Sequence, residues 1–169
     1  MAIHNWREEL KLSQQKLESV KSRAAKELNK PIRSLQTKPI ASIRPATTLR
    51  TAASEFIDFD VEHALVQETP DTFVGVLRRE AVHAAIVAAG KETPSVTVVT
   101  IMDRNICVEP DSATIGEVLN RMAWGGCTCA VLVNSEGEPS GIISPSIILD
   151  HVNELINEEP QSFQIAMNG

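Results

Sequence analysis

Residues 99–152 read VTIMDRNICVEPDSATIGEVLNRMAWGGCTCAVLVNSEGEPSGIISPSIILDHV, and this stretch decides the fold. Short apolar runs alternate with amphipathic runs, and turns rich in glycine, proline or acidic residues separate them. The pattern predicts, in order, a strand ending at Cys107-Val108, a helix over 113–123 capped by Ser112, strands over 128–133 and 141–143, and a helix from Pro145 to about residue 156.

The same order of elements precedes this stretch, with strands predicted over 40–43, 63–67 and 73–77 and helices over 49–57 and 80–89. Apolar positions and a strand glycine correspond at a constant offset of 66 residues, as in the pairs Leu49 and Ile115, Val66 and Leu132, Gly75 and Gly141, and Val82 and Ile148. A register held from 49 to 86 indicates a duplicated unit. Each unit is too small to bury a core well alone, so we expect the two to pack as one body.

The first 30 residues follow a different pattern. Asn5 is a suitable N-cap, and Pro31 disfavours helix at the residue before it, so the sequence predicts a helix over 5–30. Its apolar residues form one narrow stripe: Trp6, Leu10, Leu17, Val20, Ala24 and Leu28. Such a stripe cannot make a core alone, so the helix must lie on the body or pair with another copy.

These patterns divide the chain into four segments: an N-terminal helix and linker (1–39), a first unit (40–102), a second unit (103–156) and a C-terminal tail (157–169). The N-terminal 50 residues carry eleven Lys/Arg and four Asp/Glu, whereas residues 51–169 carry five and eighteen. A basic arm therefore precedes an acidic body. Such an arm suits nucleic acid, a membrane surface, an acidic protein or the acidic body itself, and its lack of interleaved aromatics disfavours nucleic acid.

Composition excludes several classes of protein. Hydrophobic residues make up 43% and charged residues 22% of the 169, so the chain should fold. No run of about 18 apolar residues is present to span a membrane, and the N-terminus lacks the apolar region of a secretory signal, so we expect a cytoplasmic protein. Three cysteines do not make a disulfide framework, and we expect reduced thiols.

The segments IM (101–102), EPDSAT (109–114) and EGEPSGII (136–143) resemble those of a CBS domain, and with the first unit the chain resembles a CBS domain pair, or Bateman module. The resemblance implies an α/β (α+β) body of two β-α-β-β-α units related by a pseudo-twofold axis, with two clefts between them. It also implies a homodimer or higher homo-oligomer. Because no enzyme or channel is attached, we expect a stand-alone pair that acts on a separate protein partner.

Many members of this family bind adenosine-containing ligands through a motif of Gly, two apolar residues, Ser/Thr, two residues and Asp. The second unit keeps the hydroxyl at Ser144 but has Ile147 in place of the Asp. The first unit has Arg78 in place of the hydroxyl residue and Ala81 in place of the Asp. The loss of both ribose carboxylates should weaken adenosine binding roughly a hundredfold.

Eight residues are candidates for contact with AMP, ADP, ATP, S-adenosylmethionine or NAD. Arg78 and Arg79, between a strand and a helix, either bind phosphate or form surface ion pairs. His63 precedes a strand where the family contacts adenine, and it is otherwise an ordinary strand-edge residue. The other candidates by resemblance are Ala64, Cys129, Ala130, Ser144 and Ile147.

Cysteine chemistry and catalysis give no further site. Cys127 and Cys129 alternate on one predicted strand with Cys107 on a neighbouring one, but no further Cys or His follows at ligand spacing, so we expect buried, inert thiols and no metal. No serine elbow, phosphate loop or His-Glu metal helix is present, and we predict no enzyme. Two functions remain: a sensor of an adenine nucleotide or related ligand that regulates a partner, and a scaffold that dimerises and presents the basic arm.

Overall fold

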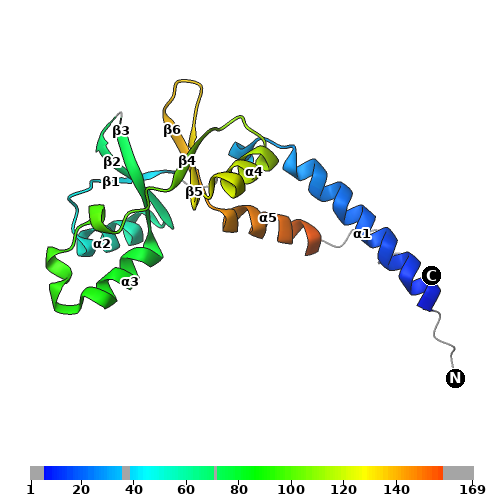
Figure 1. The fold of residues 1–169 in the computed structure, drawn as a ribbon, viewed down its shortest axis with the longest axis horizontal. Helices are drawn as coiled ribbons and strands as arrows, with labels where there is room; N and C mark the ends of the chain where they lie inside the picture. The colour runs from blue at the N-terminus through cyan, green and yellow to red at the C-terminus, as the bar shows by residue number, and fades with distance from the viewer. Residues whose placement is uncertain (1–5, 36–38, 71, 158–169) are drawn as a thin grey trace.

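The computed structural model describes residues 6–35, 39–70 and 72–157, and it consists of a long helix followed by two units of the same design (Figure 1). The helix is α1 (Trp6–Leu28), and the turn η1 (Ile32–Leu35) follows it. The first unit contains β1 (Ala41–Ile43), α2 (Leu49–Phe59), β2 (His63–Thr69), β3 (Thr72–Arg78) and α3 (Arg79–Ala89). After the turns η2 (Gly90–Ser95) and η3 (Val98–Thr100), the second unit contains β4 (Ile106–Pro110), α4 (Ile115–Gly125), β5 (Cys129–Val133), β6 (Pro139–Ile143) and α5 (Pro145–Asn157).

Each unit folds its three strands into one sheet. The first two strands of a sheet run parallel and are joined by a helix, whereas the second and third run antiparallel and are joined by a tight turn. The duplicated register is visible in the pairing, because Ala64 faces Leu77 in the first sheet and Ala130 faces Ile143 in the second. The α+β class with tandem β-α-β-β-α units is therefore confirmed.

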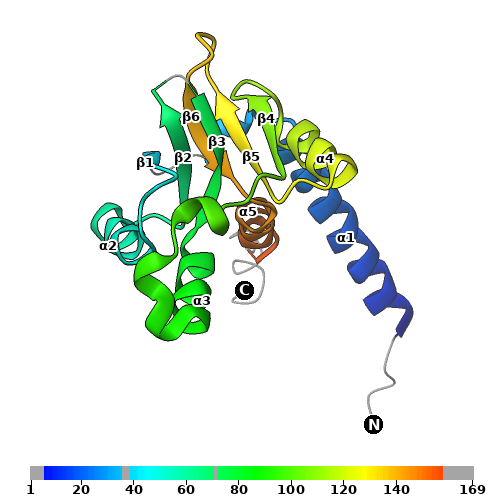
Figure 2. The ribbon, with the colours of Figure 1, turned by 60° about the vertical axis from the view of Figure 1, so that its left-hand side comes forward.

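The two units share a core where their sheets meet. Leu65 and Val76 of the first sheet pack with Cys129, Val131 and Ile142 of the second, and all five side chains are buried. The helices α2 and α3 lie beside the first sheet, and α4 and α5 lie beside the second (Figure 2). Each unit also has its own core between its sheet and its helices. The body is thus held by three apolar clusters rather than by either unit alone.

The connection between the units pairs with the edge strand β3 of the first sheet next to Gly75. The N–H of Val76 donates to the carbonyl of Asp103 at 2.9 Å, and the N–H of Asp103 donates back to Val76 at 2.8 Å. A Cβ at position 75 would lie 2.6 Å from the carbonyl oxygen of Asp103. Only glycine allows this approach of two backbones, which explains why the first copy of the strand glycine is needed.

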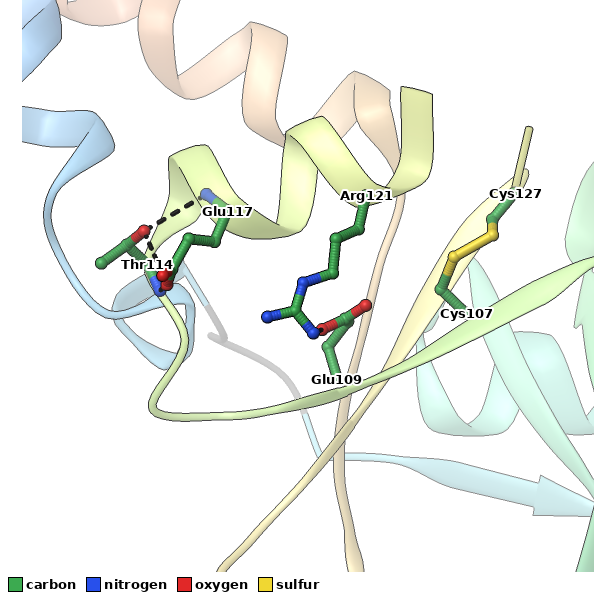
Figure 3. Close-up of polar contacts among 6 residues, drawn as sticks. All are labelled: Cys107, Glu109, Thr114, Glu117, Arg121 and Cys127. Carbon is green, nitrogen blue, oxygen red and sulfur yellow. Dashed lines mark hydrogen bonds and ion pairs between the residues drawn. A yellow bond between two sulfur atoms is a disulfide. The ribbon is translucent and has the colours of Figure 1, made fainter. Parts of the chain in front are cut away.

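The start of α4 differs from the prediction. The sequence predicts a helix over 113–123 with Ser112 as its cap, but α4 begins at Ile115 and Thr114 is the cap. The Thr114 hydroxyl accepts from the Glu117 N–H, and the Glu117 carboxylate accepts from the Thr114 N–H at 2.8 Å (Figure 3). The Thr114 N–H, together with the Thr114 hydroxyl at 3.0 Å, donates to the Glu117 carboxylate, and these two bonds lower the pKa of Glu117. Ser112 has no comparable partner three residues on, because position 115 is Ile.

The expectation of three reduced thiols is wrong for two of them. Cys107 on β4 and Cys127 in the turn after α4 form a disulfide, with Cα atoms 5.8 Å apart (Figure 3). The parallel pairing of Ile106 with Cys129 brings the two segments together although 20 residues separate the bonded cysteines. Cys129 is free and buried, as expected. The covalent loop therefore encloses the whole of α4.

The inner end of α1 packs on the second unit. The side chains of Val20, Ala24 and Leu28 are partly covered, and α1 contacts both α5 and α4. The carboxylate of Glu27 lies 3.2 Å from Nε2 of His151 on α5 and 2.6 Å from Nζ of Lys30. The arm therefore lies on the body over its last three turns, one of the two arrangements that the stripe predicts. Asn5, the predicted cap, lies outside the described residues.

The segment after α1 is built into the second unit. Ile32 is fully buried in the core that α4 and α5 share. Its N–H donates to the carbonyl of Ala113 at 2.7 Å, and the N–H of Ile115 donates to the carbonyl of Lys30 at 2.9 Å. Residues predicted as a linker thus supply a core side chain and backbone hydrogen bonds.

Acidification should weaken the contact between α1 and α5. The hydrogen bond from Lys30, and next to it that from His151, lower the pKa of Glu27 below 4.5. A carboxyl with a lowered pKa stabilises the fold above its usual pKa, and this contribution is lost as the pH falls through the lowered value. We expect Glu27→Gln to cost about 0.5–1 kcal/mol of unfolding free energy at pH 7 and less at pH 3.

Urea denaturation at the two pH values measures this difference. Glu18→Gln is the matched control, because Glu18 is exposed and pairs with Lys21 of the same helix. The control should change stability little at either pH. A cost for Glu27→Gln that is the same at pH 3 and pH 7 would show that its charge does not hold the arm.

Candidate ligand-binding site

Arg78 lies where β3 ends and α3 begins. Its backbone is extended and forms the N-cap of α3, and its side chain makes no capping hydrogen bond. The guanidinium is partly exposed, and its Nη1 lies 2.6 Å from the Glu80 carboxylate. A cation at a helix N-terminus, where the N–H groups point outward, can receive a phosphate if Glu80 turns aside.

Arg79 makes a different ion pair. Its guanidinium binds the carboxylate of Glu62, the residue before β2, and its backbone N–H donates to the Glu62 carbonyl at 2.9 Å. The side chain is thereby fixed along the edge of the first unit. Both arginines thus have acidic partners. This agrees with the second of the two predicted roles for them, the formation of surface ion pairs.

His63 lies opposite Arg78 in the pairing of β2 with β3. Burial lowers the pKa of His63, and the nearby Arg78 cation lowers it further. The imidazole is therefore neutral at pH 7 and can accept or donate one hydrogen bond at each nitrogen. This pairing brings two of the predicted residues together at one edge of the first sheet.

The other predicted residues on the strands are inside the body. Ala64 and Ala130 are fully buried, and Cys129 is 1% exposed. Ile147 is partly buried and packs against the core of the second unit. Where the family has a carboxylate, this chain thus has a side chain held by apolar neighbours. These four side chains shape the body and have no exposed polar group to offer a ligand.

Ser144 lies at the junction of β6 and α5, the position that corresponds to Arg78 at the offset of 66. Like Glu109, it is a buried polar residue, and its hydroxyl lies 2.7 Å from that of Ser146. Two hydroxyls, one just before α5 and one in its first turn, can donate to an anion or to each other. The second junction therefore offers neutral donors where the first offers a cation.

The structure adds Asp103 and Thr128 to this region, which the sequence reasoning missed. The Thr128 hydroxyl donates to Asp103, which also accepts from the Asn105 N–H at 2.9 Å. Burial raises the pKa of the Cys129 thiol to about 11, Asp103 raises it too, and Arg78 opposes this. At the offset of 66, Thr128 corresponds to Glu62, the partner of Arg79 in the first unit. This correspondence is the signal in the sequence that could have identified Thr128.

Neither metal binding nor a membrane span emerges from the part of the chain that the structure describes. No three His, Cys, Asp or Glu side chains gather there in a way that could hold a metal ion. No helix among those residues is both long enough and apolar enough to cross a bilayer. The described polar groups at the two strand–helix junctions thus remain the candidates for ligand contact.

Residues 98–154 match the model of the CBS domain family. No curated protein matches the sequence. Among solved structures, an uncharacterized conserved protein from Pyrococcus horikoshii is 25% identical, with a TM-score of 0.59, over 73% of this chain and 92% of that one.

Two further solved structures are similar in fold. The CBS domain of the bacterial CNNM/CorC family Mg2+ transporter is 19% identical, with a TM-score of 0.64, over 94% of this chain and 98% of that one. The same type of domain in complex with ATP is 19% identical, with a TM-score of 0.63, over 85% and 99%.

Proposed function

The chain carries a CBS domain at residues 98–154 and has the fold of CBS domain structures, and on this premise we propose that it is a regulatory protein rather than an enzyme. In this proposal it binds an adenine nucleotide or a related phosphate-bearing ligand and modulates a separate protein partner. It acts as a homodimer or higher homo-oligomer. Phosphate, rather than ribose, dominates recognition.

The position of Arg78 carries the proposal. It is a partly exposed cation at the N-terminus of an 11-residue helix, and it lies opposite the neutral histidine His63 in the pairing of β2 with β3. A phosphate here would meet a guanidinium and the outward N–H groups of the first turn of α3 together. His63 would then lie beside the base, and Ser144 would supply a hydroxyl from the corresponding junction.

The ATP complex of a structural neighbour supports a nucleotide as the ligand class. The two replaced carboxylates favour a phosphate-based contact over a ribose-based one, because Ala81 and Ile147 cannot accept the ribose hydroxyl protons. We therefore propose that ATP and ADP bind more tightly than AMP, and AMP more tightly than adenosine. S-adenosylmethionine, which has no phosphate, should bind least, and NAD should lie between.

Binding should depend on Arg78 and on salt. Arg78→Ala should weaken ATP binding by about 1.5–3 kcal/mol, the value of a hydrogen bond to a charged group. The same affinity should fall as salt screens the guanidinium and phosphate charges. Isothermal titration calorimetry measures both. Arg50→Ala is the matched control, since Arg50 is exposed in the first turn of α2, away from the end of α2 that leads to His63.

Restoring the missing carboxylates tests the same site by a gain, rather than a loss, of binding. Ala81→Asp should tighten AMP and ADP binding, and Ile147→Asp should do so in the second unit if its cost to the core is small. A saturating ligand at about 100 times its dissociation constant should add about 2.7 kcal/mol of stability. If neither wild type nor Ala81→Asp binds any of these ligands, the sensor is excluded.

A scaffold is the second candidate, and two observations favour it. Ile147 packs against the core of the second unit where a ribose carboxylate would stand, and Arg78 and Arg79 are both paired with carboxylates. In this alternative the body dimerises and presents α1 without a ligand. The absence of any thermal shift with every nucleotide, together with a stable dimer, would favour the scaffold.

A further inference from the structure

The outer part of α1, residues 6–19, extends away from the body. Figures 1 and 2 both show this end of the helix apart from every other labelled element. Its 14 residues are about 21 Å long at the rise of an α-helix. A helical segment of this length is marginal in water without a partner. None of the described elements outside α1 covers this segment, so a further contact is needed for the helix to be stable there.

The apolar stripe that docks the inner end of α1 continues into this outer part. Leu10 and Leu17 lie within about 40° of Ala24 around the helix axis. They are 51% and 53% exposed, whereas Val20, Ala24 and Leu28 of the same stripe are partly covered by the second unit. The outer leucines thus extend an existing helix–helix contact face beyond the end of its partner.

We propose that the outer half of α1 pairs with the outer half of α1 in a second copy of this chain, antiparallel, with Leu10 of each copy beside Leu17 of the other. This names the surface for the homodimer in the proposed function and rests on that part of it. The stripe is self-complementary because Ser13, a small residue, lies between its two leucines. One face used twice gives closed twofold symmetry, the commonest form of homo-oligomer.

Charge and the position of the bodies favour the antiparallel orientation. In a parallel pair, Lys16 of one helix would lie beside Lys21 of the other, because residues five apart meet across such a pair. This contact occurs twice by symmetry, and in each the two lysine charges would repel. In the antiparallel pair the two bodies also lie at opposite ends of the paired helices, since each body holds its helix over residues 20–28.

Sedimentation of the full chain at tens of micromolar tests the proposal. We expect twice the chain mass of 18.4 kDa for the wild type and a monomer for Leu17→Asp, because a carboxylate would enter the apolar contact. Leu12→Asp is the matched control and should stay dimeric, since Leu12 is 60% exposed but lies on another face of the helix. A dimeric Leu17→Asp would overturn this surface and leave the homodimer standing. A monomeric wild type would overturn both.

Cross-linking gives a second readout that needs no loss of folding. Ser13→Cys should form an intermolecular disulfide under mild oxidation with oxidised glutathione, two thiols giving one disulfide and two reduced glutathiones. Ser19→Cys is exposed on another face and should not cross-link. Equal cross-linking of the two variants would overturn the pairing. Neither variant touches Arg78, so nucleotide titrations report on the ligand proposal independently.

Discussion

Replacing Ile32 with alanine should lower the free energy of unfolding by about 2–5 kcal/mol, the usual cost of removing a buried isoleucine side chain to its Cβ. Ile32 is fully buried among the helices of the second unit although it follows α1 in sequence. The loss would leave a cavity between η1, α4 and α5. Urea denaturation monitored by circular dichroism measures the change.

Two further variants make the result specific. Ile32→Val should cost about 0.5–1.5 kcal/mol, because only one methyl group is removed. Arg33→Ala should cost less, since Arg33 is exposed and its guanidinium lies 3.7 Å from Asp111. If all three variants are equally stable, residues 30–33 do not belong to the core of the second unit.

Reduction of the disulfide should destabilise the protein by about 3 kcal/mol. The Cys107–Cys127 bond closes a loop of about 20 residues, and the stabilisation in the chain-entropy model grows with the logarithm of that length. The double variant Cys107→Ser and Cys127→Ser should lose the same amount and become insensitive to reductant. Thermal denaturation with and without dithiothreitol measures both effects.

A thiol count checks the premise of this prediction. Cys129 is buried and its pKa is raised to about 11, so the native protein should react with no thiol reagent at pH 8. The unfolded, unreduced protein should show one free thiol. Three free thiols in that state would mean that Cys107 and Cys127 are not joined, and Cys129→Ser would then leave two.

Local patterns in the sequence predicted most of the fold. The alternation of short apolar runs with capped amphipathic runs predicted every strand, and α2, α3 and α5, to within two residues. The offset of 66 predicted two similar units with a shared core, because core residues of the first unit such as Phe56 and Val82 have the apolar counterparts Met122 and Ile148 in the second. Periodicity reports which face of an element is buried, and this is a local property of the sequence.

Features that hydrophobic periodicity does not record were missed. Thr114 rather than Ser112 caps α4 because only Thr114 has a glutamate three residues later that can bond back to it. The Cys107–Cys127 bond depends on strand pairing, and the burial of Ile32 depends on backbone bonds to Ala113 and Ile115. None of these leaves a periodic trace in the chain.

The candidate site was likewise predicted only in part: the positions of its residues were predicted, and their side-chain partners were not. The resemblance correctly placed Arg78 and Ser144 at two equivalent strand–helix junctions. It gave no sign of their partners, Glu80 and Ser146, nor of the hydrogen bond between Thr128 and Asp103. Side-chain pairing across a junction depends on rotamers and on neighbouring segments, and a motif records neither.

An isolated β-bridge joins Pro31, just after α1, to Thr114, the N-cap of α4. Movement of α1 is therefore coupled mechanically to α4. The free end of the helix lies roughly 20 Å from the contact on α5, whereas the backbone bonds of residues 30–33 clamp its other end to the N-terminus of α4. A small sideways force on the free end therefore becomes a torque on α4. Since the disulfide ties the far end of α4 to β4, that torque passes into the second sheet rather than being absorbed by a loop.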